Sequence, residues 1–288
     1  MKTERSKSYE LIPSYSAPSS WWQHVPVAHW LIEYLKPKKV VELGTHYGVS
    51  FFSFCEAANI YSPETFLYAI DTWEGDEQAG FYNNEVYDRV LKNQLSNHQS
   101  RSRLIRSTFD DASKMFGDKS IDILHIDGLH TYSAVKHDFE TWEDKVKEGG
   151  TIMFHDWNVR ERDFGVWKLW EEIKHCSGYQ CLEMPNGHGL GLATKGSEKP
   201  SWHIELRKEI KALTAKGCLL EKISIEREEK ERLLQEQKNL KMIIIEKEKE
   251  CDALGEHAKE LNKIIEHQNK NILAKLVQKL KRDDKKLD

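Results

Sequence analysis

The sequence contains no long uninterrupted apolar segment. No stretch approaches the roughly 18 consecutive apolar residues that a membrane-spanning helix requires, although 39% of the 288 residues are hydrophobic. The first residues, MKTERSKSYE, also lack the apolar core of a secretory signal peptide. These absences argue against an integral membrane protein and lead us to expect a soluble protein of the cytoplasm.

The sequence has neither a large excess of charge of one sign nor a recognisable cysteine pattern. Its formal net charge is −4, which argues against a general nucleic-acid binder. The number of cysteines is odd, and their spacing matches no zinc or redox motif. They are Cys55, Cys176, Cys181, Cys218 and Cys251. We therefore expect no nucleic-acid partner and a reducing compartment.

Aromatic residues are absent from the last part of the chain. All nine tryptophans precede Glu205, and Lys, Glu and Arg dominate after it. This change of composition predicts a globular domain followed by a solvated helical segment. The predicted parts are an N-terminal arm (1–20), a domain (21–198), a linker with the start of a helix (199–218) and a coiled coil (219–288).

Short apolar segments alternate with helical periodicity throughout the predicted domain. This alternation predicts an α/β fold, a Rossmann-like doubly wound and mostly parallel sheet with helices on both faces. Ligands of such sheets bind beyond the carboxyl ends of the strands. The predicted strands are 39–44, 65–71, 102–105, 121–127 and 151–155, and the predicted helices are 24–36, 49–59, 82–99, 110–116, 133–146 and 164–175.

A glycine pair follows the first predicted strand. Gly44 and Gly48 would allow the backbone to approach a ligand, and the next helix would present free N–H groups. The segment is neither a P-loop, since no Lys follows Gly48, nor a dinucleotide G-x-G-x-x-G motif. An ordinary strand–helix turn is the alternative.

Asp71 ends the second strand, 27 residues after Gly44, where a carboxylate can hold ribose hydroxyls or cap a helix. The combination favours a ligand site.

Two further strands end in acidic residues. Asp127 and Asp156 should lie close together, because they end neighbouring parallel strands, and such a pair either binds a divalent cation or repels. His130 follows Asp127 by three residues and could act as a base. Helix and turn caps are the alternative for each residue alone. Their common placement at strand ends favours a site.

These segments together resemble class I S-adenosylmethionine-dependent methyltransferases. The motifs, which occur in order, are VELGTHYGVS (41–50), AIDTW (69–73), IDGLHTY (126–132) and FHD (154–156). More narrowly, the chain is similar to the bacterial branch found with glycosyltransferases in polysaccharide gene clusters. It is more distantly similar to the metal-dependent sugar O-methyltransferases of macrolide biosynthesis. The resemblance covers about residues 20–195 and implies that the domain (21–198) is a methyltransferase domain.

The resemblance implies a role for each motif. The cofactor S-adenosylmethionine would contact Glu42, Gly44, Thr45, Gly48, Ser50, Asp71 and Ser107. His130 would be the catalytic base, together with Asp127. Asp127, His155 and Asp156 would bind a divalent metal, either Mg²⁺ or, since imidazole is a softer ligand, a transition metal.

The acceptor would be a sugar or glycan hydroxyl in polysaccharide synthesis of the O-antigen type. Trp73, Tyr82, Arg160 and Arg162 are candidate acceptor contacts, and the alternative for the last segment is a helix that packs Trp167 and Trp170 on the sheet. Two other functions stay open at this point. One is a non-catalytic coiled-coil scaffold that recruits glycan-synthesis partners, and the other is a small-molecule O-methyltransferase.

Positions at alternating spacings of four and three from Leu219 to Ile272 form a seam in which eleven of sixteen residues are apolar. This heptad pattern predicts a coiled coil, and the polar Lys230 and Gln237 within it favour a parallel dimer. A single solvated helix is the alternative. Residues 272–280 form an apolar face surrounded by lysines, which would dock on an anionic membrane surface or on a glycan-synthesis protein, or would simply end the coiled coil. Docking of this kind would place the enzyme at the periphery of the inner membrane.

Overall fold

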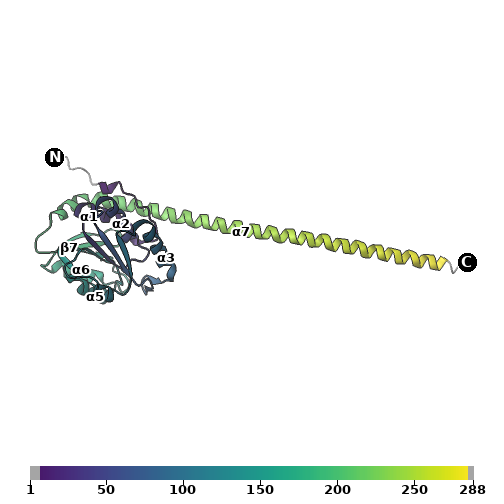
Figure 1. Cartoon of the computed structure of the whole chain (residues 1–288), viewed down its shortest axis with the longest axis horizontal. Coiled ribbons are helices and arrows are strands. Elements are labelled where there is room, and N and C mark those ends of the chain that lie inside the picture. Colours follow the sequence, from purple (N-terminus) through teal and green to yellow (C-terminus); the bar gives the residue numbers. More distant parts are fainter. Residues whose placement is uncertain (1–6, 285–288) are drawn as a thin grey trace. The chain divides into compact units, whose positions relative to one another are not determined.

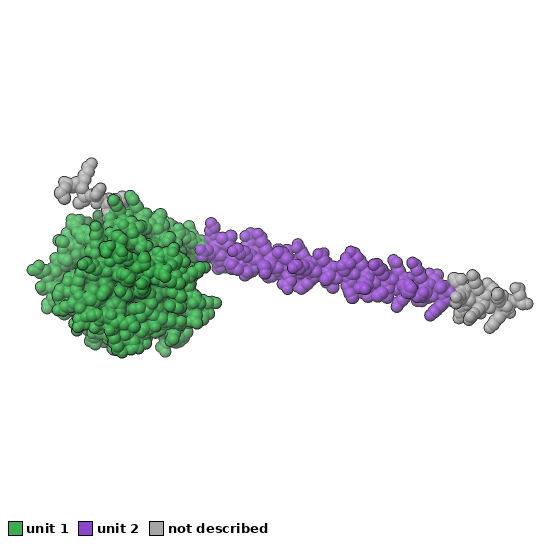
Figure 2. Space-filling model, viewed as in Figure 1, with its two compact units in different colours: residues 1–228 green, residues 229–288 purple. Residues whose placement is uncertain are grey.

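The computed structural model describes residues 7–284 of the chain and the side chains of residues 7–276 (Figure 1). The chain divides into two compact units, Met1–Glu228 and Glu229–Asp288 (Figure 2). Within the described residues, no helix is long and apolar enough to cross a membrane. The first unit contains the sheet and every site residue named above, and the second is helical.

A seven-stranded sheet in the order β5-β2-β1-β6-β7-β9-β8 forms the centre of the first unit. The strands β5, β2, β1, β6 and β7 are parallel, while β9 is antiparallel to both of its neighbours. Their bounds are β1 Lys39–Leu43, β2 Phe66–Asp71, β5 Ser102–Arg106, β6 Ile121–Ile126, β7 Val146–His155, β8 Tyr179–Met184 and β9 Leu190–Lys195. The predicted mostly parallel, Rossmann-like sheet is confirmed.

Helices cover both faces of the sheet, and neighbouring residues of a strand point to opposite faces. In β1, Val40 belongs to one hydrophobic cluster and Val41 to the other. The first cluster joins α1 (Val25–Leu35), α2 (Val49–Tyr61), α3 (Asn84–Asn93) and the start of α7, and the second joins α4 (Phe109–Ser113), α5 (Tyr132–Trp142) and α6 (Val166–His175). Five shorter helices and strands complete the fold. They are η1 Lys7–Tyr9, η2 Ser20–His24, β3 Gly75–Asp76, β4 Gly80–Phe81 and η4 Glu143–Lys145, and the π-helical η3 Gln94–His98 extends α3.

The long helix α7 (Ser201–Asp284) begins inside the first unit. Residues 199–218, predicted as a linker and helix start, are helical from Ser201 and contribute Trp202, Leu206 and Leu213 to the core. Leu220 is 5% exposed, whereas Leu219, a residue of the predicted seam, is 57% exposed. The packed face of this part of the helix therefore lies one residue beyond the predicted seam.

The second unit continues α7 as a helix, as the heptad pattern predicts. Seam residues such as Leu240, Ile244 and Leu261 are exposed along it. The helical structure of the tail is thus confirmed, while its pairing stays a prediction. The predicted basic amphipathic end falls in part beyond the described residues, because no side chain is described after Leu276.

Candidate functional site

A cavity of about 1030 Å³ opens at the carboxyl ends of β1, β2, β6 and β7. Its wall contains residues from the segments 44–50, 71–82, 127–130 and 156–164, together with Phe109 and with His188 from the β8–β9 turn. Pro18, Ser19 and Ser20 of the N-terminal arm complete it. This is the edge where open parallel sheets bind ligands, so the strand-end motifs of the sequence meet in one place.

The glycine loop after β1 needs both of its glycines. Gly44 has a φ of +85°, and a Cβ there would stand 2.1 Å from the backbone oxygen of Asp127. Gly48 has a φ of +81° and precedes α2 without a side-chain cap. The first N–H groups of α2 are therefore not capped by a side chain at this position, and Val49 and Ser50 line the cavity beside them.

Asp71 holds the glycine loop in place. Its Oδ2 accepts hydrogen bonds from the backbone N–H groups of Thr45 at 2.8 Å and His46 at 2.9 Å. Its Oδ1 accepts the N–H of Trp73 at 2.7 Å. The carboxylate still lines the cavity, so a ligand would share it with the backbone of the loop.

Three predicted contacts do not line this cavity: Glu42, Ser107 and Trp73. Glu42 is fully buried, and its Oε2 lies 2.9 Å from Nδ1 of His125, whose Nε2 accepts the indole N–H of Trp21. Burial raises the pKa of Glu42 despite the facing histidine. The indole of Trp73 is buried and donates to the backbone oxygen of His46. Glu42 and Trp73 are therefore placed to support the wall of the cavity from behind.

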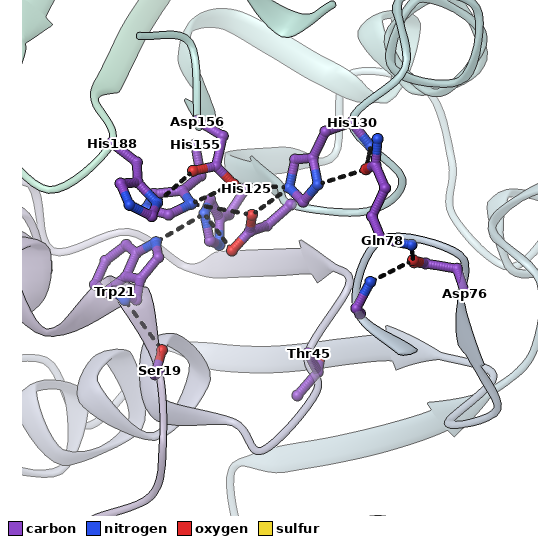
Figure 3. A network of polar contacts seen from close by, with 12 residues as sticks. Ser19, Trp21, Thr45, Asp76, Gln78, His125, His130, His155, Asp156 and His188 are labelled. Atoms are coloured by element: carbon purple, nitrogen blue, oxygen red, sulfur yellow. Dashed lines mark hydrogen bonds and ion pairs between the residues drawn. The ribbon is translucent and has the colours of Figure 1, made fainter. Parts of the chain in front are cut away.

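The centre of the site joins two aspartates through two histidines (Figure 3). Nε2 of His130 lies 3.2 Å from Oδ1 of Asp127 and 2.9 Å from Oδ2 of Asp156. Nδ1 of His155 lies 3.2 Å from each of the same two oxygen atoms. A third imidazole, that of His188, meets the other oxygen of Asp156 at 3.1 Å.

The two aspartates raise the pKa of both histidines that lie between them. Burial lowers the pKa of His130, but hydrogen bonds and charge from Asp127 and Asp156 outweigh burial and raise it to about 9. Burial opposes the same two charges at His155, whose pKa is raised to about 10. Burial in turn disfavours ionised aspartates, yet the histidines hold the pKa of Asp127 well below its usual range. The cluster is a compact set of paired charges.

The other atoms around His130 fit an imidazolium. Its Nδ1 lies 3.1 Å from Oε1 of Gln78, which also accepts the backbone N–H of His130 at 2.9 Å. Its ring stacks on Phe164 with 4.9 Å between centroids and an angle of 4°. Both ring nitrogens thus face acceptor oxygens, as a doubly protonated ring requires.

The ligand set for a metal differs from the expected one. Asp127, His130 and Asp156 each offer a ligand atom, and these atoms lie within 4.8 Å of one another. His155 is buried behind the two aspartates and is not among the residues that line the cavity. Two carboxylates and an imidazole nitrogen suit a divalent transition metal at least as well as Mg²⁺, so the residues present fit such an ion.

The remaining acceptor candidates reach the cavity. Tyr82, Arg160 and Arg162 line it. The guanidinium of Arg160 lies over the ring of Trp167, 4.7 Å from its centroid, and donates to the backbone oxygen of Trp157. The expected alternative holds for Trp170, which is fully buried in the core.

Several cavity residues were not predicted from the sequence. Gln78 and Phe164 contact His130 directly, and His188 reaches the site from a turn between two strands that the sequence pattern did not indicate. Ser19 and Ser20 come from the segment predicted as a separate arm. None of these residues lies at the end of a parallel strand. The expectation that ligands bind beyond the carboxyl ends of the strands, which located the other residues, therefore does not find them.

The central part of the chain is similar to known proteins. Residues 41–157 match the family model of a methyltransferase domain. An uncharacterized protein of Sinorhizobium fredii is 44% identical over 180 residues, which are 62% of this chain and 20% of that protein. The chain thus spans about a fifth of the length of this curated relative.

Solved structures resemble the chain at low sequence identity. A proposed caffeoyl-CoA O-methyltransferase of Staphylococcus aureus has a TM-score of 0.49 and 19% identity, covering 64% of this chain and 86% of that one. The O-methyltransferase TomG of Streptomyces achromogenes has a TM-score of 0.47 and 12% identity, covering 68% and 92%. The similarity to a methyltransferase domain thus spans residues 41–157, which contain the glycine loop, Asp71, Asp127 and Asp156.

Proposed function

We propose that the chain is an S-adenosylmethionine-dependent O-methyltransferase that methylates a sugar hydroxyl during polysaccharide synthesis. One observation carries the proposal. The glycine loop after β1 and the Asp127–His130–Asp156 cluster face the same cavity at the carboxyl ends of the strands. A cofactor at the loop and an acceptor at the cluster would therefore lie side by side, as direct methyl transfer requires.

The cofactor half of the cavity would use the glycine loop and its support. Gly44, Thr45, Gly48 and Ser50 line it, and the uncapped start of α2 offers backbone donors. Asp71 supplies the acceptor oxygens for ribose hydroxyls while it keeps the loop in place. The sulfonium of the cofactor carries the reactive methyl group, so the protein has to supply position and proton transfer.

The acceptor half would use His130 as the base. A sugar hydroxyl is a weak nucleophile, and a neutral imidazole beside it can take its proton as the methyl group is transferred. The imidazole starts out protonated, because its pKa is raised to about 9 by the two aspartates. It must therefore lose this proton before it can act as a base.

A divalent ion at the two aspartates would help His130 to lose this proton. Asp127 and Asp156 would hold it, and its charge would acidify both a bound hydroxyl and the imidazolium of His130. Nε2 of His130 faces both carboxylates, so the same atom could instead complete the ligand set. We propose the role of base for it, and binding of metal to a His130 variant distinguishes the two roles.

The acceptor class is supported by the size and rim of the cavity. A volume of about 1030 Å³ is at the upper end for a single small ligand, for which roughly 300–1,000 Å³ is usual. Arg160 and Arg162 offer donors for hydroxyls or phosphates, and Tyr82 offers a ring beside them. These features suit a sugar or a nucleotide sugar next to the cofactor.

Calorimetric titration of S-adenosylhomocysteine tests the cofactor site. We expect binding to the wild type, a loss of at least tenfold in affinity for Asp71→Ala, and no change for the surface variant Asp118→Ala. Methyl transfer to a panel of nucleotide sugars and glycans, followed by mass spectrometry, then tests the acceptor. If the wild type bound no S-adenosylhomocysteine with or without added metal, the enzyme proposal would fail and the coiled-coil scaffold would replace it.

A further inference from the structure

Residues 229–276 of α7 expose an apolar stripe along their length. Leu240 is 60% exposed, Ile244 56%, Leu261 48% and Ile265 52%. A solvated helix that carries such a stripe normally buries it against a partner. The helix is continuous through this region, so its residues keep the heptad spacing that a coiled coil needs.

The seam residues of this stripe form a nearly palindromic pattern. Its centre lies between Asp252 and Ala253, and each seam residue before the centre has a matching residue at the same distance after it. The matched residues are Leu233 with Ile272, Gln237 with Gln268, Leu240 with Ile265, Ile244 with Leu261, Lys247 with Ala258, and Cys251 with Leu254.

We infer that two copies of the chain associate through this stripe with their α7 helices antiparallel, in place of the parallel dimer expected from the heptad composition. In an antiparallel pair centred at this point, every match becomes one layer of the interface. In four of the six layers apolar residues then meet apolar residues, and Gln237 meets Gln268 of the partner subunit, where the two amides can exchange hydrogen bonds. The contact is isologous, as a closed homodimer requires.

The residues beside the seam support the same register. Ile243 and Ile264 are 52% and 50% exposed and flank the seam on one side. In the antiparallel pair, Ile243 lies beside Ile264 of the partner subunit, which widens the apolar contact. Glu250 lies beside His257 of the partner subunit and can form an ion pair with it when the imidazole is protonated.

A parallel pair in register is less complementary. It places Lys247 against Lys247 of the partner subunit in the middle of the seam, where two like charges repel. It also places Ile243 beside Glu248 of the partner subunit, so the apolar flank faces a charge. The antiparallel pair brings Lys247 beside Ala258 instead. Its own like-charged contact joins Lys230 and Lys275 at the ends, where long side chains can extend into water.

Disulfide trapping of the full-length chain distinguishes the two orientations. The background carries Cys176→Ser and Cys251→Ser, because these two cysteines are the exposed ones. Leu233→Cys and Ile272→Cys are prepared separately, with tags of different mass, and oxidised alone and as a mixture. The matched control mixes Leu233→Cys with Lys270→Cys, since Lys270 lies on the opposite face of the helix from the seam.

We expect a disulfide-linked dimer only in the mixture of Leu233→Cys with Ile272→Cys. Cross-linking of each variant with itself, and not in the mixture, would overturn the antiparallel arrangement in favour of the parallel one. Sedimentation of the wild type and of both variants shows whether pairing exists at all. A monomeric wild type at tens of micromolar would overturn the inference altogether.

Discussion

Oδ2 of Asp71 accepts a hydrogen bond of 2.8 Å from the backbone N–H of Thr45, so the residue that ends β2 also shapes the loop after β1. Asp71→Asn replaces one acceptor oxygen with a donor NH₂ group that would face backbone N–H groups. We expect a loss of ~1–3 kcal/mol in the free energy of unfolding without ligand, together with weaker binding of S-adenosylhomocysteine.

Urea unfolding of the ligand-free variant checks this prediction. Asp118→Asn is the control, because Asp118 is exposed and pairs with Lys145 at the surface. A variant that lost ligand binding but kept the stability of the wild type would show that Asp71 acts on the ligand alone and that the loop does not depend on it.

His130→Gln should separate catalysis from binding. Glutamine keeps a polar side chain but cannot accept the proton of a hydroxyl, so we expect methyl transfer to fall by ~10²–10⁴-fold. Affinity for S-adenosylhomocysteine should change by less than twofold, since Asp71 and the glycine loop are intact. Equilibrium dialysis with Mn²⁺ and with Mg²⁺ completes the measurement. Retained metal binding agrees with the role of base, whereas lost binding would identify His130 as a ligand.

The burial of His29 predicts that the free energy of unfolding decreases in acid. It is fully buried in α1, and neither ring nitrogen has a hydrogen-bond partner among the described residues. Burial, with a contribution from Lys216, lowers its pKa from 6.5 to about 3. The unfolded chain therefore binds this proton at a higher pH than the folded chain, and stability falls as the pH drops below about 6.5.

For this one group, the expected loss between pH 7 and pH 5 is about 2 kcal/mol. His29→Leu removes the group, so the variant should lose about that much less than the wild type over the same interval. Urea unfolding of both proteins at both pH values gives the difference, in which the contributions of other histidines cancel. Equal losses in the two proteins would contradict the prediction.

Two glycines of α7 should respond in opposite directions to alanine. A Cβ at Gly217 would stand 2.1 Å from the backbone oxygen of Gln23, whereas a Cβ at Gly255 meets nothing within 4 Å. Gly217→Ala should destabilise the first unit by ~1–3 kcal/mol, because backbone atoms have to move. Gly255→Ala should stabilise the helix by ~1 kcal/mol.

Tryptophan fluorescence follows the first variant, since all nine tryptophans lie in the first unit. Circular dichroism at 222 nm follows the helical content of the second. If Gly217→Ala unfolded at the same temperature as the wild type, the close contact between α7 and the segment before α1 would be wrong.

The sequence by itself determined the five parallel strands of the sheet and most of the site residues at their edge, but not the strands β8 and β9. Short apolar strands that are each followed by a polar side chain are sufficient to predict that Asp71, Asp127 and Asp156 lie at one edge, because parallel strands share one carboxyl edge, and all three line the cavity. The same pattern indicated the helical tail. The matching halves of its seam can also be read from the sequence, once the helix is known to be unbroken.

Only the tertiary structure decided which polar atoms face one another. Glu42 ends up against His125 instead of in the cavity, and His130 joins His155 between the two aspartates, on the side that lines the cavity. Gln78 arrives from a loop 52 residues away from His130. Strand periodicity fixes the edge at which a residue lies, but side-chain direction and loop path depend on long-range packing, and a single sequence does not reveal them.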